Sequence, residues 1–177
     1  MVQGYCLGGH NHLAYCCDFT IAAEDAIFGQ AGPKVSSPAD GFMVPYLCRV
    51  VGAKKARELW MLCRRYTAIE ALEMGLVNRV VPLERLEAEV DKWCDDMLAL
   101  SPGCLEILKA AFDQEMDGYA ELGVISSQFY PDWFDMPEGK EGGAAFMEKR
   151  RPQFWKLRQR EDEMRQELMR EYEKEKK

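Results

Sequence analysis

Three short motifs near the start of the chain constrain its fold more than any other feature. Residues 4–9 (GYCLGG) form an apolar run that ends in two glycines and leads into a short helical pattern. Residues 17–23 (CDFTIAA) and 28–34 (FGQAGPK) follow closely. Backbone N–H groups at a helix start can stabilise a developing negative charge without any side chain. A glycine pair between apolar runs is, however, equally typical of a tight strand-to-helix turn.

Composition predicts a soluble globular protein with one sizeable core. The chain has 177 residues, of which 47% are hydrophobic and 30% charged. A net charge of −7 argues against general nucleic-acid binding, and no apolar run reaches membrane-spanning length. We therefore expect no nucleic-acid or membrane partner.

The cysteine and histidine pattern predicts no metal site. None of the seven cysteines forms a Cys-x-x-Cys pair, and the two histidines, His10 and His12, lack zinc-ligand spacing. An odd number of cysteines suits a reducing, cytoplasmic location. Four cysteines in apolar helical patterns are interpreted as small buried hydrophobes: Cys48, Cys63, Cys94 and Cys104.

Apolar periodicity predicts an opening with strands and a continuation that is mostly helical. Strands are expected at 2–7, 19–23, 26–29 and 76–81, with a short helix at 11–17. The loop at 31–42 is polar and rich in proline and glycine, so we place it at a rim. Helices are predicted at 53–62, 68–74, 83–100, from Pro102 through Phe134, and at 138–149. Thr67 is the expected cap of the second of these helices.

The last residues, from Gln159 onward, are dense in Glu, Lys and Arg and predict a solvated helix or a frayed extension. A coiled coil with a partner is an alternative, although Met164, Leu168 and Tyr172 supply only a short apolar seam.

The element order predicts an α/β layered domain. Three segments are expected: a partial α/β core at 1–82, a helical region at 83–158 and the charged tail at 159–177. Few strands are visible for a sheet that is buried on both faces. We therefore interpret the chain as the second half of a domain.

The motifs resemble those of the crotonase (enoyl-CoA hydratase/isomerase) superfamily over residues 2 to 157. The resemblance rests on GYCLGG, CDFTIAAEDAIFGQ, the following loop and ARELWMLCRRYTAIEALEMGLVNRVVP. Within the superfamily, FGQAGPKV, VGAKKARELWMLCRRY and EGGAAFMEKRRPQF are most similar to the 1,4-dihydroxy-2-naphthoyl-CoA synthases. The resemblance implies the C-terminal portion of a ClpP/crotonase-type spiral ββα domain, followed by a helical trimerisation region. It also implies an N-terminally truncated member and a homotrimer or hexamer (a dimer of trimers).

The resemblance implies an oxyanion hole for an acyl-CoA thioester, with the N–H of Gly9 as one of its two donors. Hydratases of the superfamily use two glutamates, and this chain has His12 and Gly32 at those positions. Ordinary hydration is therefore not expected, because it needs a positioned acid and base. His12 is either a base or a packed helix residue, since imidazole titrates near neutrality.

Glycine at position 32 resembles the naphthoyl-CoA synthases that recruit bicarbonate in place of a carboxylate. Gln30, Gly32 and Trp60 would line that anion site, although by sequence alone Trp60 is better interpreted as a core-packing residue. No tightly bound cofactor is implied; coenzyme A is part of the substrate.

Further site residues are carried over from the same resemblance. Ser37 matches a substrate-holding serine, and Asp40 stands one residue beyond the family's aspartate, so it is either a site residue or a turn residue. Phe134 stands where the family has a tyrosine, with Tyr130 one helical turn earlier as a substitute. Lys149 and Arg150 fall at the family's basic site for coenzyme A phosphates, as cations suit that task.

The expected function is a lyase reaction of menaquinone synthesis, the intramolecular Claisen ring closure of 2-succinylbenzoyl-CoA. One alternative is ring opening of 2-oxocyclohexanecarboxyl-CoA by a related hydrolase, and another is a general enoyl-CoA hydratase or isomerase. A non-catalytic subunit is the alternative of a different class.

Overall fold

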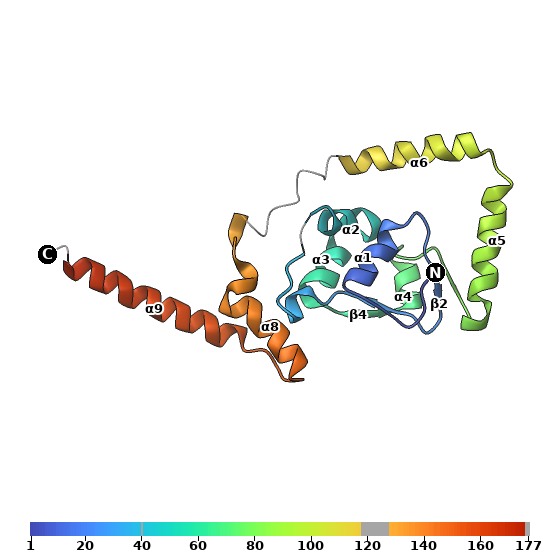
Figure 1. Ribbon diagram of the computed structural model, residues 1–177. Helices are drawn as coiled ribbons and strands as arrows, with labels where there is room; N and C mark the ends of the chain where they lie inside the picture. Colours follow the sequence, from blue (N-terminus) through green and yellow to red (C-terminus); the bar gives the residue numbers. More distant parts are fainter. Residues whose placement is uncertain (40, 118–127, 176–177) are drawn as a thin grey trace.

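The computed structural model describes residues 1–39, 41–117 and 128–175 and has a mixed α/β core with helices extending on both sides (Figure 1). Within these residues five short strands form two small sheets. β1 (Tyr5–Leu7) pairs in parallel with β3 (Ile27–Gly29), which pairs antiparallel with β4 (Arg65–Thr67). β2 (Ile21–Ala23) and β5 (Arg79–Val81) form a parallel pair, and a bridge from Val2 to Ala22 links it to the chain of β1.

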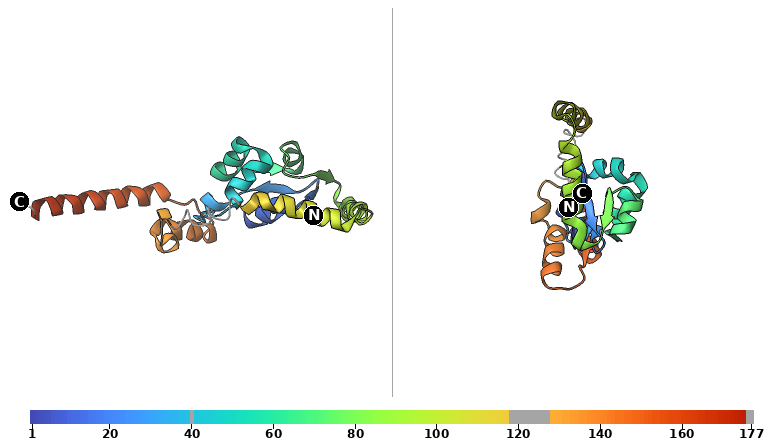
Figure 2. Two further views of the ribbon diagram at one scale, coloured as in Figure 1. Left: turned by 90° about the horizontal axis from the view of Figure 1, so that it is seen from above. Right: turned by 90° about the vertical axis from the view of Figure 1, so that its right-hand side faces the viewer.

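Helices surround the sheets and also extend beyond them. The core helices are α1 (Gly9–Cys16), α2 (Met43–Val51), α3 (Ala53–Leu62) and α4 (Ala68–Glu73). On one side of the core lie α5 (Leu86–Leu98) and α6 (Pro102–Asp117), and on the other α8 (Pro137–Met147) and α9 (Phe154–Glu175). Short 3₁₀ turns occur at η1 (Gly32–Lys34), η2 (Leu83–Arg85) and η4 (Trp133–Asp135). Figure 2 shows α9 pointing away from the body, with the two termini at opposite ends.

The main core lies where α1, α2 and α3 meet the strands. Phe28, Leu47 and Leu59 are fully buried there, and Trp60 and Tyr66 nearly so. Full burial of a large apolar side chain contributes about 1.5–3 kcal/mol, so this cluster holds the strands that carry the site. A smaller cluster joins β2 and β5 to α5.

Most of the predicted elements are present, with shorter strands. The cap on α4 is confirmed: the Thr67 hydroxyl accepts from the Glu70 N–H, and the Glu70 carboxylate accepts from the Thr67 N–H. β4 was not predicted, because in a three-residue strand only Tyr66 is buried and no alternation can be recognised. Of the helix predicted from Pro102 through Phe134, the first part is confirmed as Pro102–Asp117, and residues 118–127 lie outside the described residues. The prediction is wrong at its far end, where residues 133–135 form a 3₁₀ turn.

The prediction that four cysteines are buried is half wrong. Cys63 is buried and Cys48 half-buried, but Cys94 and Cys104 are exposed. The reason is that α5 turns Leu86, rather than Cys94, toward the core, while α6 lies on the outside of the molecule (Figure 1). None of the described helices is long and apolar enough to cross a membrane.

Close backbone contact attaches α8 to the loop that follows β3. Gly142 is buried, and a Cβ there would collide with the backbone of Val35 and the Ser36 Oγ. The Trp133 indole Nε1 donates to the Ser36 carbonyl at 2.7 Å and ties the segment before α8 to the same loop. The neighbouring Gly143 has open space where a Cβ would stand.

Gly142→Ala is therefore expected to lower the free energy of unfolding by about 1–3 kcal/mol, as overpacking does. Gly143→Ala is the matched control and is expected to raise it by up to about 1 kcal/mol, because alanine favours the helix. Urea unfolding followed by circular dichroism and tryptophan fluorescence measures both. Equal changes in the two variants would contradict the proposed contact.

Candidate functional site

The turn between β1 and α1 presents backbone donors at one edge of the sheet. Gly8 adopts φ 58° and ψ −121°, a conformation that favours glycine. Its N–H donates to the Gly29 carbonyl at 3.0 Å, and its carbonyl accepts from the His12 N–H. α1 then begins at Gly9, which is exposed and has no side chain capping the helix start. This geometry suits the predicted oxyanion role of the Gly9 N–H.

His12, Gln30 and Trp60 lie together below this turn. The His12 Nε2 and the Gln30 Oε1 are 3.2 Å apart, and the imidazole ring lies 5.1 Å from the Trp60 ring. Because an amide oxygen only accepts, the Nε2 of His12 carries the proton in this pair. Burial lowers the pKa of His12, and the hydrogen bond with Gln30 partly offsets that shift. His12 is therefore neutral near pH 7, and its Nε2–H is bound to Gln30.

Several buried polar atoms around this group have no partner in the described part of the chain. They include the Gln30 Nε2, the Trp60 Nε1 and the Ser36 Oγ, on residues that are all less than a tenth exposed. Leaving such a group unpaired costs about 1–3 kcal/mol. Ser36 and Trp60 also line a cavity, and buried unpaired donors at a cavity are typical of a site for an anion or a carbonyl oxygen.

A cavity of about 340 Å³ lies beside Gly32. The Ser37 carbonyl oxygen lies 2.5 Å from the position that a Cβ of Gly32 would take, so this loop conformation requires glycine there. Trp60 forms the inner wall, and Trp133, Glu138 and Phe154 from the C-terminal segment also line the cavity.

The loop brings two serines to this cavity. Ser37, the predicted substrate-holding residue, is exposed at its edge, with its N–H bonded to the Gly32 carbonyl. Ser36 is the buried serine and has φ 54°, a strained conformation for a residue with a side chain. Asp40 lies outside the described residues.

Tyr130 and Phe134 do not line this cavity. The Tyr130 hydroxyl accepts from the Arg158 Nη2 at 3.2 Å, while Phe134 is 68% exposed. The same segment instead places Trp133 and Glu138 at the cavity wall, with the Glu138 carboxylate bonded to the Arg158 Nε at 2.5 Å. A substrate role for Tyr130 and Phe134 stays a prediction.

Lys149 and Arg150 lie just after α8. Lys149 is exposed and has φ 54°. The Arg150 guanidinium is bonded to both carboxylate oxygens of Glu141 and to Glu148. Its bonds to Glu141, together with the hydrogen bond from the Gln153 backbone N–H, lower the pKa of Glu141 to about 2. Arg150 and Arg151 also line a separate cavity of about 500 Å³. In this arrangement the guanidinium of Arg150 is already paired, so a role in binding phosphate would require it to exchange partners.

Four residues that line the cavity were not predicted from the sequence. Ser36, Trp133, Glu138 and Phe154 line the cavity, and no motif marks them. Asn11 is a further unpredicted residue: it is fully buried on α1, with neither its Oδ1 nor its Nδ2 paired. A polar residue at a core position of α1 is the one available sequence signal, and it applies to Asn11 alone.

Fold and site together define an α/β protein whose sheet edge presents backbone donors beside a cavity lined by buried polar groups. Residues 1–158 match the enoyl-CoA hydratase/isomerase family, and the chain belongs to this family. The fold is accordingly of the crotonase type.

Solved structures with similar folds include a methylmalonyl-CoA decarboxylase, which is 25% identical with a TM-score of 0.79 over 87% of this chain and 61% of that one. An enoyl-CoA hydratase/carnithine racemase from Magnetospirillum magneticum is 32% identical with a TM-score of 0.61, over 85% and 56%. An enoyl-CoA hydratase from Mycobacterium avium subsp. paratuberculosis K-10 is 29% identical with a TM-score of 0.72, over 86% and 63%. This chain spans about three fifths of the length of these structures.

The lowered pKa of His12 predicts a loss of stability on acidification. The unfolded chain takes up this proton near the ordinary pKa of 6.5, and the folded chain only at lower pH. The contribution of neutral His12 to the free energy of unfolding is therefore fully present above pH 6.5. It is lost as the pH falls toward the folded pKa, because the unfolded state binds more protons in that window. We expect His12→Gln to show a smaller loss of unfolding free energy than the unsubstituted chain between pH 7.5 and 5.5.

Urea titrations at the two pH values measure this difference. His10→Gln is the control: His10 is exposed on the same helix, and its substitution is expected to leave the pH dependence unchanged. The same pH dependence in the His12 variant and the unsubstituted chain would show that His12 is not a buried neutral group.

Proposed function

We propose that this chain carries out enolate chemistry on a coenzyme A thioester, with ring closure of 2-succinylbenzoyl-CoA to 1,4-dihydroxy-2-naphthoyl-CoA as the leading reaction. Family membership supports the thioester substrate. The hydratase glutamates are replaced by His12 and Gly32, so water addition lacks its usual carboxylates. Ring closure needs an oxyanion hole and a base, but no second side-chain carboxylate.

Two buried, unpaired donors, the Gln30 Nε2 and the Trp60 Nε1, are the observation that carries the proposal. Trp60 forms a wall of the cavity at Gly32, while Gln30 is tied to this region through His12, which lies against the Trp60 ring. The resemblance associates Gln30, Gly32 and Trp60 with a bicarbonate site, and the two donors suit a small oxyanion. The Ser37 carbonyl and the Trp60 Cζ3 lie next to the Cβ position of Gly32, so the proposal places the anion nearer the two donors than Gly32.

Bicarbonate bound at that position would supply the base for the carbon acid. The chain's own residues act through binding and orientation. The N–H of Gly9 donates to the thioester oxygen as negative charge develops on it, an interaction typically worth about 3–4 kcal/mol in the transition state. The aromatic rings of Trp60, which is buried, and Phe154, which is half-buried, line this region and reduce the access of water to it.

His12 acts as a positioning residue in this proposal. Its Nε2–H binds the Gln30 Oε1, which fixes the amide so that its Nε2 remains the free donor. With its pKa lowered by burial, His12 stays neutral and adds no charge to the anion site. This assigns His12 the packed, hydrogen-bonded role rather than that of a base.

A substrate panel tests the proposal against its alternatives. The purified chain is incubated with 2-succinylbenzoyl-CoA, 2-oxocyclohexanecarboxyl-CoA, crotonyl-CoA and methylmalonyl-CoA, with and without added bicarbonate, and products are identified by mass spectrometry. Bicarbonate-dependent ring closure is the expected result. Ring opening without ring closure would favour the hydrolase alternative, and binding without turnover of any thioester would favour a non-catalytic subunit.

Trp60→Phe keeps the aromatic wall and removes only the indole N–H. We expect it to lower the rate roughly 10- to 100-fold at fixed bicarbonate, since a hydrogen bond to a charged group contributes about 1.5–3 kcal/mol. The bicarbonate concentration for half-maximal rate should rise in parallel, which a purely structural role would not produce.

Trp93→Phe is the matched control for this experiment. The Trp93 Nε1 donates to Glu89 within α5, away from the cavity, so the substitution should leave the bicarbonate dependence unchanged. An unaltered bicarbonate curve in the Trp60 variant would contradict the assignment of its N–H to the anion.

A further inference from the structure

The C-terminal helix α9 leaves most of its length uncovered by the rest of the chain. The Arg158 guanidinium holds the first turns of α9 to Glu138 of α8 and to the hydroxyl of Tyr130, which precedes α8. Beyond this anchor the helix extends away from the body (Figure 1 and the left view of Figure 2). At about 1.5 Å per residue its 22 residues span about 33 Å.

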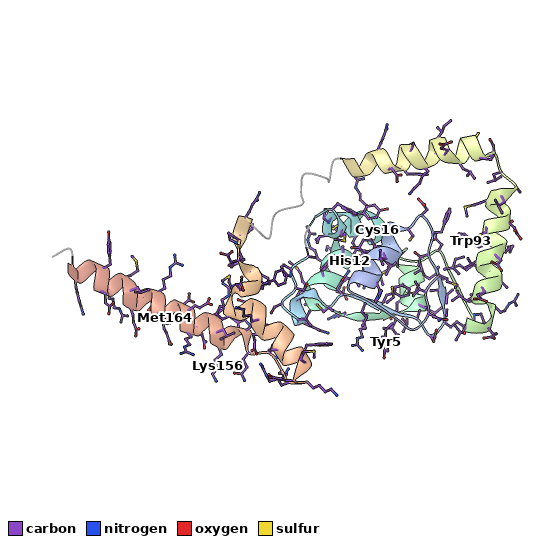
Figure 3. The ribbon with its side chains drawn as sticks, in the orientation of Figure 1. Tyr5, His12, Cys16, Trp93, Lys156 and Met164 are labelled. Carbon is purple, nitrogen blue, oxygen red and sulfur yellow. The ribbon has the colours of Figure 1, made fainter. Side chains whose placement is uncertain are left out.

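One face of α9 carries an apolar stripe. Leu157, Met164, Leu168 and Tyr172 recur at helical spacing, and the last three are 53–65% exposed. Glu161 stands between Leu157 and Met164 on the same face and interrupts the stripe. In Figure 3 Met164 lies on the projecting part of the helix. Helices in proteins gain most of their stability from packing an amphipathic face, so burying the stripe against a second helix would stabilise α9.

One edge of the stripe carries two like-charged pairs of opposite sign, here called blocks. Lys156 and Arg160 form the first block, and Glu167 and Glu171 form the second, each pair four residues apart. Lys174 follows on the same edge near the end of the helix. All four side chains of the blocks are exposed, and the described part of the chain shows no ion pair for them. Glu163, Arg170 and Lys174 of the same helix stand three residues from Arg160, Glu167 and Glu171, so only part of the like-charge repulsion is left for a partner to offset.

The two blocks are arranged symmetrically about the point between Glu163 and Met164. Arg160 and Glu167 are equally far from it, and so are Lys156 and Glu171. A second α9 running in the opposite direction would therefore face each basic residue with an acidic one. A uniformly acidic or uniformly basic surface would be repelled by one half of this edge.

We propose that α9 is a self-association element, which pairs antiparallel with α9 of a second copy of this chain. The stripe supplies the apolar contact, and the contacts Arg160–Glu167 and Lys156–Glu171 form twice and set the direction. This association adds to whatever assembly the rest of the fold makes, and it does not depend on the proposed reaction.

Sedimentation velocity of the full chain tests the apolar contact. We expect Leu168→Glu to halve the mass of the largest assembly, or to weaken its formation at least tenfold. Gln166→Glu is the matched control, since it adds the same charge on the opposite face of the helix and should leave the mass unchanged. Circular dichroism of each variant verifies that the helix is retained.

Mixing two charge variants tests the direction. Arg160→Glu and Glu167→Arg should each fail to associate through α9 when alone, because like charges then face each other. An equimolar mixture should recover the assembly, since in an antiparallel pair Glu at position 160 of one chain faces Arg at position 167 of the other. Rising salt should weaken the unsubstituted assembly and the mixture alike.

Two results would overturn the proposal. The first is an identical mass distribution for Leu168→Glu, Gln166→Glu and the unsubstituted chain, which would leave α9 to another partner or to solvent. The second is a mixture that stays dissociated although each variant retains its helix, which would exclude the antiparallel arrangement.

Discussion

The parallel pairing of β1 with β3 is the constraint on which the rest of the site depends. Its register sets Leu7 opposite Gly29, and the Gly8 N–H extends the ladder to the Gly29 carbonyl. Because parallel strands end at the same edge of a sheet, the turn at Gly9 and the side chain of Gln30 emerge together. Gly29 itself tolerates no side chain, since a Cβ would lie 2.7 Å from the Arg64 carbonyl beside β4. The backbones of β1, β3 and the residue before β4 therefore meet at Gly29 without intervening side chains.

The second half of the site is built by the loop after β3 and by the segment that closes over it. The loop turns back on Gly32, and the indole of Trp133 and the backbone of Gly142 hold its outer side. Residues about a hundred positions apart thus form opposite walls of one cavity. Close backbone approach, rather than side-chain recognition, attaches α8 here, which explains why glycine stands at a buried helical position.

The contribution of the sequence differs between these two halves. Local patterns in GYCLGG and FGQAGPK predicted the turn and the strands that carry Gly9, Gln30 and Gly32. The roles of these three residues came from the family resemblance and stay predictions. Local patterns could not predict the second half, because Trp133 and Glu138 reach the cavity only through tertiary packing. Ser36 was missed for a related reason. A Ser-Ser pair offers no sign of which hydroxyl is buried, and the choice depends on a positive φ that the closed loop imposes.

The chemistry proposed for the cavity follows from its balance of donors and carboxylates. Among the described residues that line it, Glu138 alone carries a carboxylate, and the Arg158 Nε binds that group at 2.5 Å. That carboxylate is therefore already engaged in an ion pair. The Gln30 and Trp60 donors, in contrast, are buried and unpaired. A site with spare donors and no free base favours an oxyanion that brings its own basicity. In this proposal, the replacement of the two hydratase glutamates therefore indicates a different reaction rather than a loss of activity.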